Sequence, residues 1–178
     1  MFKDFNITPF KKMKPPSDNS FDTMQEIKAL KKTPLNKKFV KDNDNIEAAF
    51  KKTAEEKNIK DYDTKVAAKL IKESAPVILK LKKHFDRPRP KAVAKKMNIK
   101  LKDIEMDSMK TPSYPSGHSA QGILIGSVLK DKYPKASSAF MKTAKNISDS
   151  RRVARAHYAS DSKMGEQLGK SMYKHVKN

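Results

Sequence analysis

Apolar residues recur at helical spacing along most of this chain, and no stretch alternates apolar and polar residues as a β-strand does. In "FDTMQEIKALKK", residues 21–32, Met24, Ile27 and Leu30 lie about one turn apart, and Asp22 can cap the helix. The segments "DNIEAAFKKTAEE" and "DTKVAAKLIKE" repeat this pattern. The chain is therefore predicted to be all-α, built from a series of amphipathic helices.

Ser74 and Pro76 predict a boundary between two helices, because serine is a favoured N-cap and proline is tolerated in a first turn. The helix that follows carries its apolar face on Val77, Ile78, Leu81 and Phe85. Lys82 lies just beside that face. "RPRP" must then leave the helix, since a residue before proline is pushed toward extended geometry.

The second half of the chain predicts closely packed helices. "SAQGILIGSVLKDKY" reads as a buried helix in which Gly122 and Gly126, four residues apart, let another helix approach. The last helix repeats an apolar residue every fourth position, at Met164, Leu168, Met172 and Val176. Residues 1–20, which contain three prolines, read as an irregular lead-in, and residues 21–178 read as a single helical domain.

Composition limits the class of protein. The chain has 178 residues, 37% of them hydrophobic, which suits one domain with a buried core. Its longest apolar runs fall well short of the ~18 residues that a membrane-spanning helix needs. Charges and prolines stand where a secretory signal would be apolar, so we expect a cytoplasmic protein. The absence of cysteine excludes disulfides, thiolate metal sites and cysteine nucleophiles.

The chain is strongly basic, with a formal net charge of +20 from 40 basic and 20 acidic residues. Such a charge attracts polyanions, of which nucleic acid is the obvious example. The lysines are spread over the whole chain without a basic arm, which favours a solvated cationic surface over a specific nucleic-acid site. We therefore expect a general attraction for anionic molecules. A homo-oligomer is also compatible with the sequence.

Three segments combine a cation or a histidine with a backbone suited to an anion. "KKHFDRPRP" places Lys82 near a helix end and Arg89 in a stiff extended stretch. Arginine can donate two parallel hydrogen bonds to a phosphate, and lysine adds a point charge. "PSGH" places Gly117 at the start of a helix, where free backbone N–H groups point at a ligand and no side chain intervenes. His118 lies on the rim of this anion cradle.

The third segment, "SRRVARAHYASD", supplies a candidate nucleophile. His157 and Asp161 are four residues apart, so the carboxylate can fix the tautomer of the imidazole and raise its basicity. Arg151 precedes His157 by six residues, which would place the two side chains about 120° apart around a continuous helix. We therefore predict that the helix ends or bends near His157, so that both side chains reach one ligand.

Together the three segments resemble a known signature. Its pattern is Lys, six residues, Arg-Pro; then Pro-Ser-Gly-His; then Ser-Arg, five residues, His, three residues, Asp, and this chain matches every position. The chain thus resembles the type 2 phosphatidic acid phosphatase superfamily, which includes bacterial class A non-specific acid phosphatases and vanadium-dependent haloperoxidases. The resemblance spans residues 82–169, about half of the chain.

The resemblance implies a helical bundle of the acid phosphatase and vanadium chloroperoxidase type, and a two-step hydrolysis of phosphomonoesters that needs no metal or other cofactor. His157 would form a phosphohistidine, Asp161 would orient it, and His118 would act as general acid and then as general base. The residues that would hold the phosphoryl group are Lys82, Arg89, Ser116, Gly117 and Arg151. Because His118 must be protonated while His157 is neutral, we expect an acidic pH optimum.

One position departs from the family pattern. Class A enzymes and many relatives carry glycine two residues before the nucleophilic histidine, where this chain has Arg155. An arginine there would crowd the pocket or add a phosphate contact, and either would change substrate size and efficiency. The lysine-rich residues 1–60 lie outside the signature and have no counterpart in it.

Two alternative functions stay open. In haloperoxidases the same pocket holds vanadate, although the short chain favours a phosphatase. A basic nucleic-acid-associated or virion structural protein on a phosphatase-like fold would account for the charge, although all seven signature side chains are intact. The sequence does not distinguish a nucleotide, a sugar phosphate or a lipid head group as the substrate.

Overall fold

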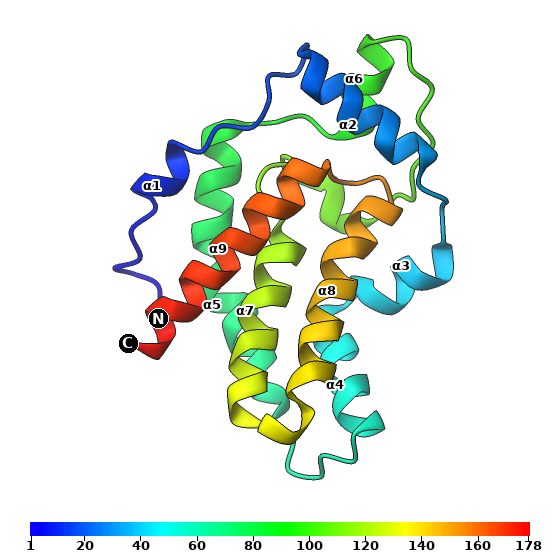
Figure 1. The fold of residues 1–178 in the computed structure, drawn as a ribbon. Helices are drawn as coiled ribbons and strands as arrows, with labels where there is room; N and C mark the ends of the chain where they lie inside the picture. Colours follow the sequence, from blue (N-terminus) through cyan, green and yellow to red (C-terminus); the bar gives the residue numbers. More distant parts are fainter.

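The computed structural model describes residues 1–178 and is entirely helical, which confirms the predicted class (Figure 1). It contains nine α-helices and two short 3₁₀ helices. The α-helices are α1 (Thr8–Lys11), α2 (Phe21–Lys32), α3 (Lys37–Asp44), α4 (Ile46–Glu56), α5 (Thr64–Phe85), α6 (Pro90–Lys96), α7 (Gly117–Lys132), α8 (Ser137–Val153) and α9 (Ala159–Lys177). The 3₁₀ helices are η1 (Asp107–Lys110) and η2 (Pro134–Ala136).

Helix α7 lies at the centre of the fold, between α8 and α9 (Figure 1). A Cβ atom on Gly126 would lie 2.8 Å from Cβ of Ala144 in α8, and one on Gly122 would meet the same helix. On the other side of α7, a Cβ atom on Gly165 or Gly169 of α9 would collide with the backbone carbonyl oxygen of Ser116, the N-cap of α7, or of Ala120 in its first turn. The prediction that Gly122 and Gly126 admit a neighbouring helix is confirmed.

Helix α5 is continuous through Pro76, so the predicted break between Ser74 and Pro76 is wrong. Proline lacks the N–H that would bond one turn back, and its ring strains an uninterrupted helix. Leu70 and Leu81, on either side of the proline, are both buried in the main core. Core contacts along one face therefore hold the helix together, and Ser74 donates its hydroxyl hydrogen to the Ile71 carbonyl instead of capping.

Two features at the N-terminal side of the fold, the start of α2 and the presence of α3, differ from what the sequence predicted. Ser20 caps α2 by accepting a hydrogen bond from the Thr23 N–H (3.2 Å), and Asp22, the predicted cap, lies inside the first turn. Helix α3 was not predicted, because its sequence "KKFVKDND" is short and contains only two apolar residues. Its Asn36 cap and its packing on α8 stabilise it.

Residues 1–20 have little regular structure apart from α1, but they are packed against the fold. Phe2 and Phe10 belong to the main hydrophobic core. The N-terminal amino group pairs with Glu73 of α5 at 2.9 Å, and the Tyr114 hydroxyl donates to the Met13 carbonyl at 2.5 Å. The lead-in therefore braces α5 and the loop that precedes α7.

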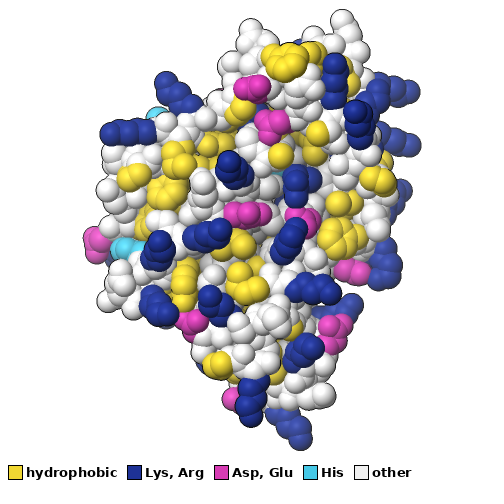
Figure 2. Space-filling view, viewed as in Figure 1, with side chains coloured by type: hydrophobic (Ala, Val, Ile, Leu, Met, Phe, Trp, Pro, Cys, Tyr) yellow, Lys and Arg dark blue, Asp and Glu magenta, His cyan; other side chains and the backbone are white.

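The surface carries its charge in a dispersed form. Figure 2 shows lysine and arginine side chains scattered over the visible face, with aspartate and glutamate among them. This distribution agrees with the even spread of lysines along the sequence. None of the helices combines the length and the apolar character that crossing a bilayer requires.

Candidate active site

Five of the predicted site residues line one pocket at the N-terminal end of α7. They are Lys82, Arg89, Gly117, His118 and His157. Three helix ends position four of them, because Lys82 lies in the last turn of α5, Arg89 is the N-cap of α6, and Gly117 and His118 open α7. The pocket has a volume of about 180 Å³, which accommodates a phosphate-sized group.

His157 lies in the loop between the end of α8 and the start of α9, which confirms the predicted break. Its Nδ1 atom is 3.1 Å from Oδ2 of Asp161, and its Nε2 atom is 2.9 Å from Nη1 of Arg89. A guanidinium group can only donate, so Nε2 accepts and the ring proton sits on Nδ1. The imidazole is therefore neutral, and its Nε2 lone pair faces the pocket.

Burial decides the charge state of His157. The residue is only 4% exposed. Burial lowers the pKa of His157 to about 3, and the nearby charges of Arg89 and Lys82 act in the same direction, while Asp161 opposes them. The predicted increase in basicity from Asp161 is therefore present but outweighed. His157 is neutral at any pH well above its lowered pKa.

Asp161 lies behind His157, away from the pocket, and is fully buried. Its carboxylate accepts hydrogen bonds from four donors, namely Arg87 Nη1 (2.8 Å), the Tyr158 N–H (3.0 Å), His157 Nδ1 (3.1 Å) and Ser113 Oγ. Burial would raise the pKa of Asp161, but these donors and the charge of Arg87 hold it below its ordinary value. The carboxylate therefore stays ionised and fixes the imidazole.

Lys82 and Arg89 supply positive charge that no carboxylate neutralises directly. Lys82 is 5% exposed, and its Nζ donates to the Pro112 carbonyl at 2.5 Å. Burial lowers the pKa of Lys82 to about 7, and the charge of Arg89 contributes. Arg89 is held by the backbone carbonyl groups of Ser108, Thr111 and Ala156. Because neither side chain forms an ion pair, both charges are available to an anion in the pocket.

The "PSGH" segment divides its residues between the helix cap and the pocket. Ser116 is fully buried and caps α7 by accepting from the Ser119 N–H at 3.2 Å, so its side chain does not line the pocket. A Cβ atom on Gly117 would lie 3.8 Å from Cε of Lys82, an ordinary contact that packing tolerates. Gly117 lines the pocket, and the predicted reason for a glycine here, room for an anion beside the backbone, stays a prediction.

Asp44, the last residue of α3, joins His118 to Arg151. His118 Nε2 lies 2.8 Å from the Asp44 carbonyl oxygen and 3.5 Å from Oδ1, and Arg151 Nη1 donates to Oδ1 at 3.0 Å. The hydrogen bond from His118 lowers the pKa of Asp44 to about 2 against the effect of burial. Burial lowers the pKa of His118, and Asp44 opposes that shift. Arg151 is 1% exposed, and its Nη2 has no hydrogen-bond partner.

Four residues of this network were missed by the sequence analysis, namely Glu26, Asp44, Arg87 and Ser113. Arg87 lies in "RPRP", next to Arg89, and Ser113 lies just before "PSGH". Their closeness in sequence to predicted site residues could have indicated them. Glu26 and Asp44 come from α2 and α3, outside the signature, where no sequence pattern marks them. The lysine-rich N-terminal helices thus contribute carboxylates to the site.

Arg155 does not line the pocket, so it neither crowds a substrate nor touches its phosphate. Its backbone is left-handed, with φ of 58°. Its guanidinium group donates to the carbonyl oxygens of Lys31, Thr33 and Lys102. Left-handed backbone favours glycine, which explains why a glycine suits this position in the resembling family. Here the arginine fastens the loop before His157 to the end of α2.

Arg155→Gly is expected to lower the free energy of unfolding by about 1 kcal/mol, because the lost hydrogen bonds outweigh the relief of left-handed strain. Urea denaturation measures this loss. The kcat/KM values for a small and a bulky phosphate ester are expected to keep their wild-type ratio, since the side chain lies outside the pocket. A changed ratio would contradict the placement of Arg155.

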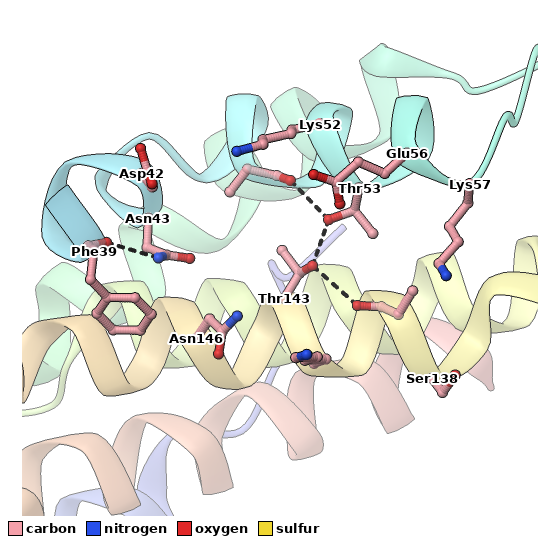
Figure 3. Close-up of a pocket in the computed structure, with 13 residues that line it drawn as sticks. Phe39, Asp42, Asn43, Lys52, Thr53, Glu56, Lys57, Ser138, Thr143 and Asn146 are labelled. Atoms are coloured by element: carbon pink, nitrogen blue, oxygen red, sulfur yellow. Dashed lines mark hydrogen bonds between the residues drawn. The ribbon is translucent and has the colours of Figure 1, made fainter.

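A second groove, with a volume of about 540 Å³, lies away from this site between α3, α4 and α8 (Figure 3). Lysine, aspartate and glutamate side chains line it together, and the hydroxyl groups of Thr53 and Thr143 meet at 2.6 Å. None of the predicted site residues lines this groove. No group of three or more histidine, aspartate or glutamate side chains in the structure is arranged to hold a metal ion.

Comparison with known proteins shows that part of the chain is similar to a phosphatase. No family model matches the chain. The chain is similar to a non-specific acid phosphatase of Salmonella typhimurium, with 32% identity over 88 residues. This match indicates a relationship to phosphatases. It covers 49% of the chain and 35% of the phosphatase, so the chain spans only about a third of that relative's length.

Proposed function

We propose that the protein hydrolyses phosphomonoesters through a phosphohistidine intermediate on His157. The supporting observation is a buried, neutral imidazole whose Nε2 lone pair opens onto a pocket with two unpaired cations, Lys82 and Arg89. This arrangement pairs a nucleophile with the charge that a phosphoryl group needs. The relationship to phosphatases points to the same class of reaction.

Substrate binding uses donors that the site leaves free. The phosphoryl oxygens take the place of His157 Nε2 in front of Arg89 and approach the ammonium group of Lys82. The N–H of Gly117 adds a donor, because backbone N–H groups in a first helical turn have no partner within the helix. These groups stabilise the charge on the phosphoryl oxygens in the transition state, a task that a metal ion performs in other phosphatases. Arg151 does not line the pocket and pairs with Asp44, so it acts on the site through Asp44 and His118.

The reaction has two steps. In the first, Nε2 of His157 attacks phosphorus in line while the bond to the leaving oxygen breaks, and Asp161 stabilises the imidazolium through Nδ1–H. His118 protonates the leaving alcohol. In the second step, His118 takes a proton from water, which attacks phosphorus and breaks the P–N bond. Phosphate leaves and His157 returns to its neutral form.

Asp44 adjusts His118 for this role. The hydrogen bonds to Asp44 raise the pKa of His118 against the effect of burial, which helps to keep the acid protonated. In the structure His118 Nε2 faces Asp44, so the ring must turn from Asp44 toward the leaving oxygen when substrate binds. His118 and His157 thus differ in environment, as an acid and a nucleophile must.

The test is release of p-nitrophenol and phosphate from p-nitrophenyl phosphate in the presence of EDTA. The wild-type protein is expected to turn over, and a panel of nucleotide, sugar and lipid phosphates then ranks substrates. No release at any pH between about 4 and 9 would sink the phosphatase proposal.

The same assay carries a pH prediction. Burial lowers the pKa of His118, the proposed general acid, and lowers the pKa of Lys82 to about 7, so kcat/KM is expected to fall with rising pH as first His118 and then Lys82 loses its proton. The pKa of His157 is about 3, so protonation of the nucleophile limits the rate only at much lower pH. The optimum is therefore acidic. A rate that rises steadily up to about pH 9 would contradict these assignments.

A further inference from the structure

An arginine that the proposed steps do not use lies directly behind Asp161. Arg87 is 2% exposed, and its Nη1 donates to Oδ1 of Asp161 and to Oγ of Ser160, both at 2.8 Å. Its Nη2 faces Oε2 of Glu26 at 3.4 Å. Its guanidinium carbon lies 3.7 Å above the centre of the Tyr158 ring. Arg87 is therefore fixed from several sides and has no route to the pocket, which it does not line.

The two oxygens of Asp161 have separate tasks. Oδ1 accepts from Arg87, while Oδ2 accepts from His157, Ser113 and the Tyr158 backbone. The carboxylate therefore links a permanent cation on one side to the proposed nucleophile on the other. In a fully buried position, each charge of this trio must be balanced by another.

Arg87 is the arginine that contacts Asp161 directly, whereas Lys82 and Arg89 act on it from a greater distance. Arg87 and Asp161 neutralise one another, so His157 can remain uncharged beside the carboxylate. Without Arg87, the buried carboxylate would gain a proton, held either by Asp161 itself or by His157 as an imidazolium. Lys82 and Arg89 face His157 from the pocket side and disfavour the imidazolium. Glu26, on α2, faces Arg87 from behind.

We propose that Arg87 is a positioning residue: by pairing with Asp161 it keeps the carboxylate ionised and His157 unprotonated, so that Nε2 of His157 can act as a nucleophile. The kinetic consequence rests on the proposed phosphatase function, but the effect on protonation does not. Glu26 holds Arg87 in place from α2, since it also accepts hydrogen bonds from the N–H and hydroxyl groups of Ser160 at 2.6 and 2.8 Å.

Two neutral variants test the proposal, Arg87→Gln and Arg87→Met. The first keeps a hydrogen-bond donor toward Asp161, and the second keeps an apolar contact with Tyr158. Arg87→Lys retains the charge, and Arg152→Gln removes a half-exposed arginine that pairs with Asp149 on the surface. Dispersed amide signals in a two-dimensional NMR spectrum establish which variants are folded.

NMR titration of the His157 ring, assigned by comparison with His157→Asn, gives the direct readout. In the wild type the ring is expected not to titrate between about pH 4 and 8. In a folded neutral variant the midpoint of its titration is expected to rise by about two pH units, into this range. Arg87→Lys and Arg152→Gln are expected to behave as the wild type. A flat His157 titration together with an Asp161 carboxyl group that stays ionised over the same pH range, read from its carboxyl ¹³C shift, in either folded neutral variant would overturn the proposal, even if its activity fell.

The kcat/KM profile for p-nitrophenyl phosphate provides the second readout. In the neutral variants the acid limb of this profile is expected to move up by about two pH units, as the His157 titration does. In Arg87→Lys the acid limb is expected to lie where it does in the wild type. A uniform loss of activity with an unmoved acid limb would show a purely structural role and would overturn the proposal. If the wild type proves inactive but His157 titrates as expected in the variants, the inference about Arg87 holds and the phosphatase function fails.

Discussion

Replacing His157 with alanine is expected to lower kcat for p-nitrophenyl phosphate by roughly 10⁴-fold or more, because the variant has no group to receive the phosphoryl group. KM is expected to change little, since Lys82 and Arg89 keep their carbonyl contacts and still bind the phosphate. Steady-state kinetics at acidic pH measures both values.

The matched control is His84→Ala. His84 lies on α5 only two residues beyond Lys82, but its side chain is exposed and does not line the pocket. It is expected to keep wild-type kcat. A His157→Ala variant with more than about a tenth of the wild-type kcat would mean that His157 is not the nucleophile.

Lys82→Met is expected to separate activity from stability. Loss of the ammonium group is expected to lower kcat/KM by about 10²- to 10³-fold, as one charged donor to the phosphoryl oxygens disappears. The melting temperature at pH 7 is expected to rise by roughly 2–4 °C, because an apolar side chain of similar length replaces a buried charge.

The sign of the stability effect follows from the pKa of Lys82. Burial lowers this pKa to about 7 in the folded state, well below the ordinary value of 10.5 that applies in the unfolded chain. The unfolded state therefore holds more protons between these values, and stability rises with pH over that window. At neutral pH the buried ammonium group costs stability, which Met removes. The exposed neighbour Lys83 gives the control, Lys83→Met, which is expected to change neither property. A parallel loss of activity and melting temperature in Lys82→Met would show that Lys82 is a structural residue.

The helical class and most helices could be predicted from apolar periodicity, because in long amphipathic segments such as 160–176 the spacing of apolar residues indicates which face is buried. Boundaries that depend on tertiary contacts could not. Pro76 signals a break, but burial of Leu70 and Leu81 on either side keeps α5 whole. Helix α3 has too few apolar residues to show a periodicity, and its packing on α8 exists only in the fold.

In the candidate site, too, the residues of the motifs could be predicted, whereas roles that depend on tertiary contacts could not. The motif residues that line the pocket were named from sequence, because their chemistry suits an anion and their spacing is specific. Ser116 was assigned to the phosphate, yet the structure places its hydroxyl in the α7 cap, a role that serine fills equally well. Arg87 and Asp44 were missed because their partners, Asp161 and His118, lie more than 70 residues away along the chain.

The most direct test of the account is to look for phosphate on His157. His118→Ala, incubated with p-nitrophenyl phosphate and quenched in alkali, is suited to trapping, because p-nitrophenol leaves with little acid assistance while water attack lacks its base. Mass spectrometry is expected to find the phosphoryl group on His157, and none in His118→Ala combined with His157→Ala. Release of p-nitrophenol in repeated turnovers with no phosphate on His157 would contradict the central claim.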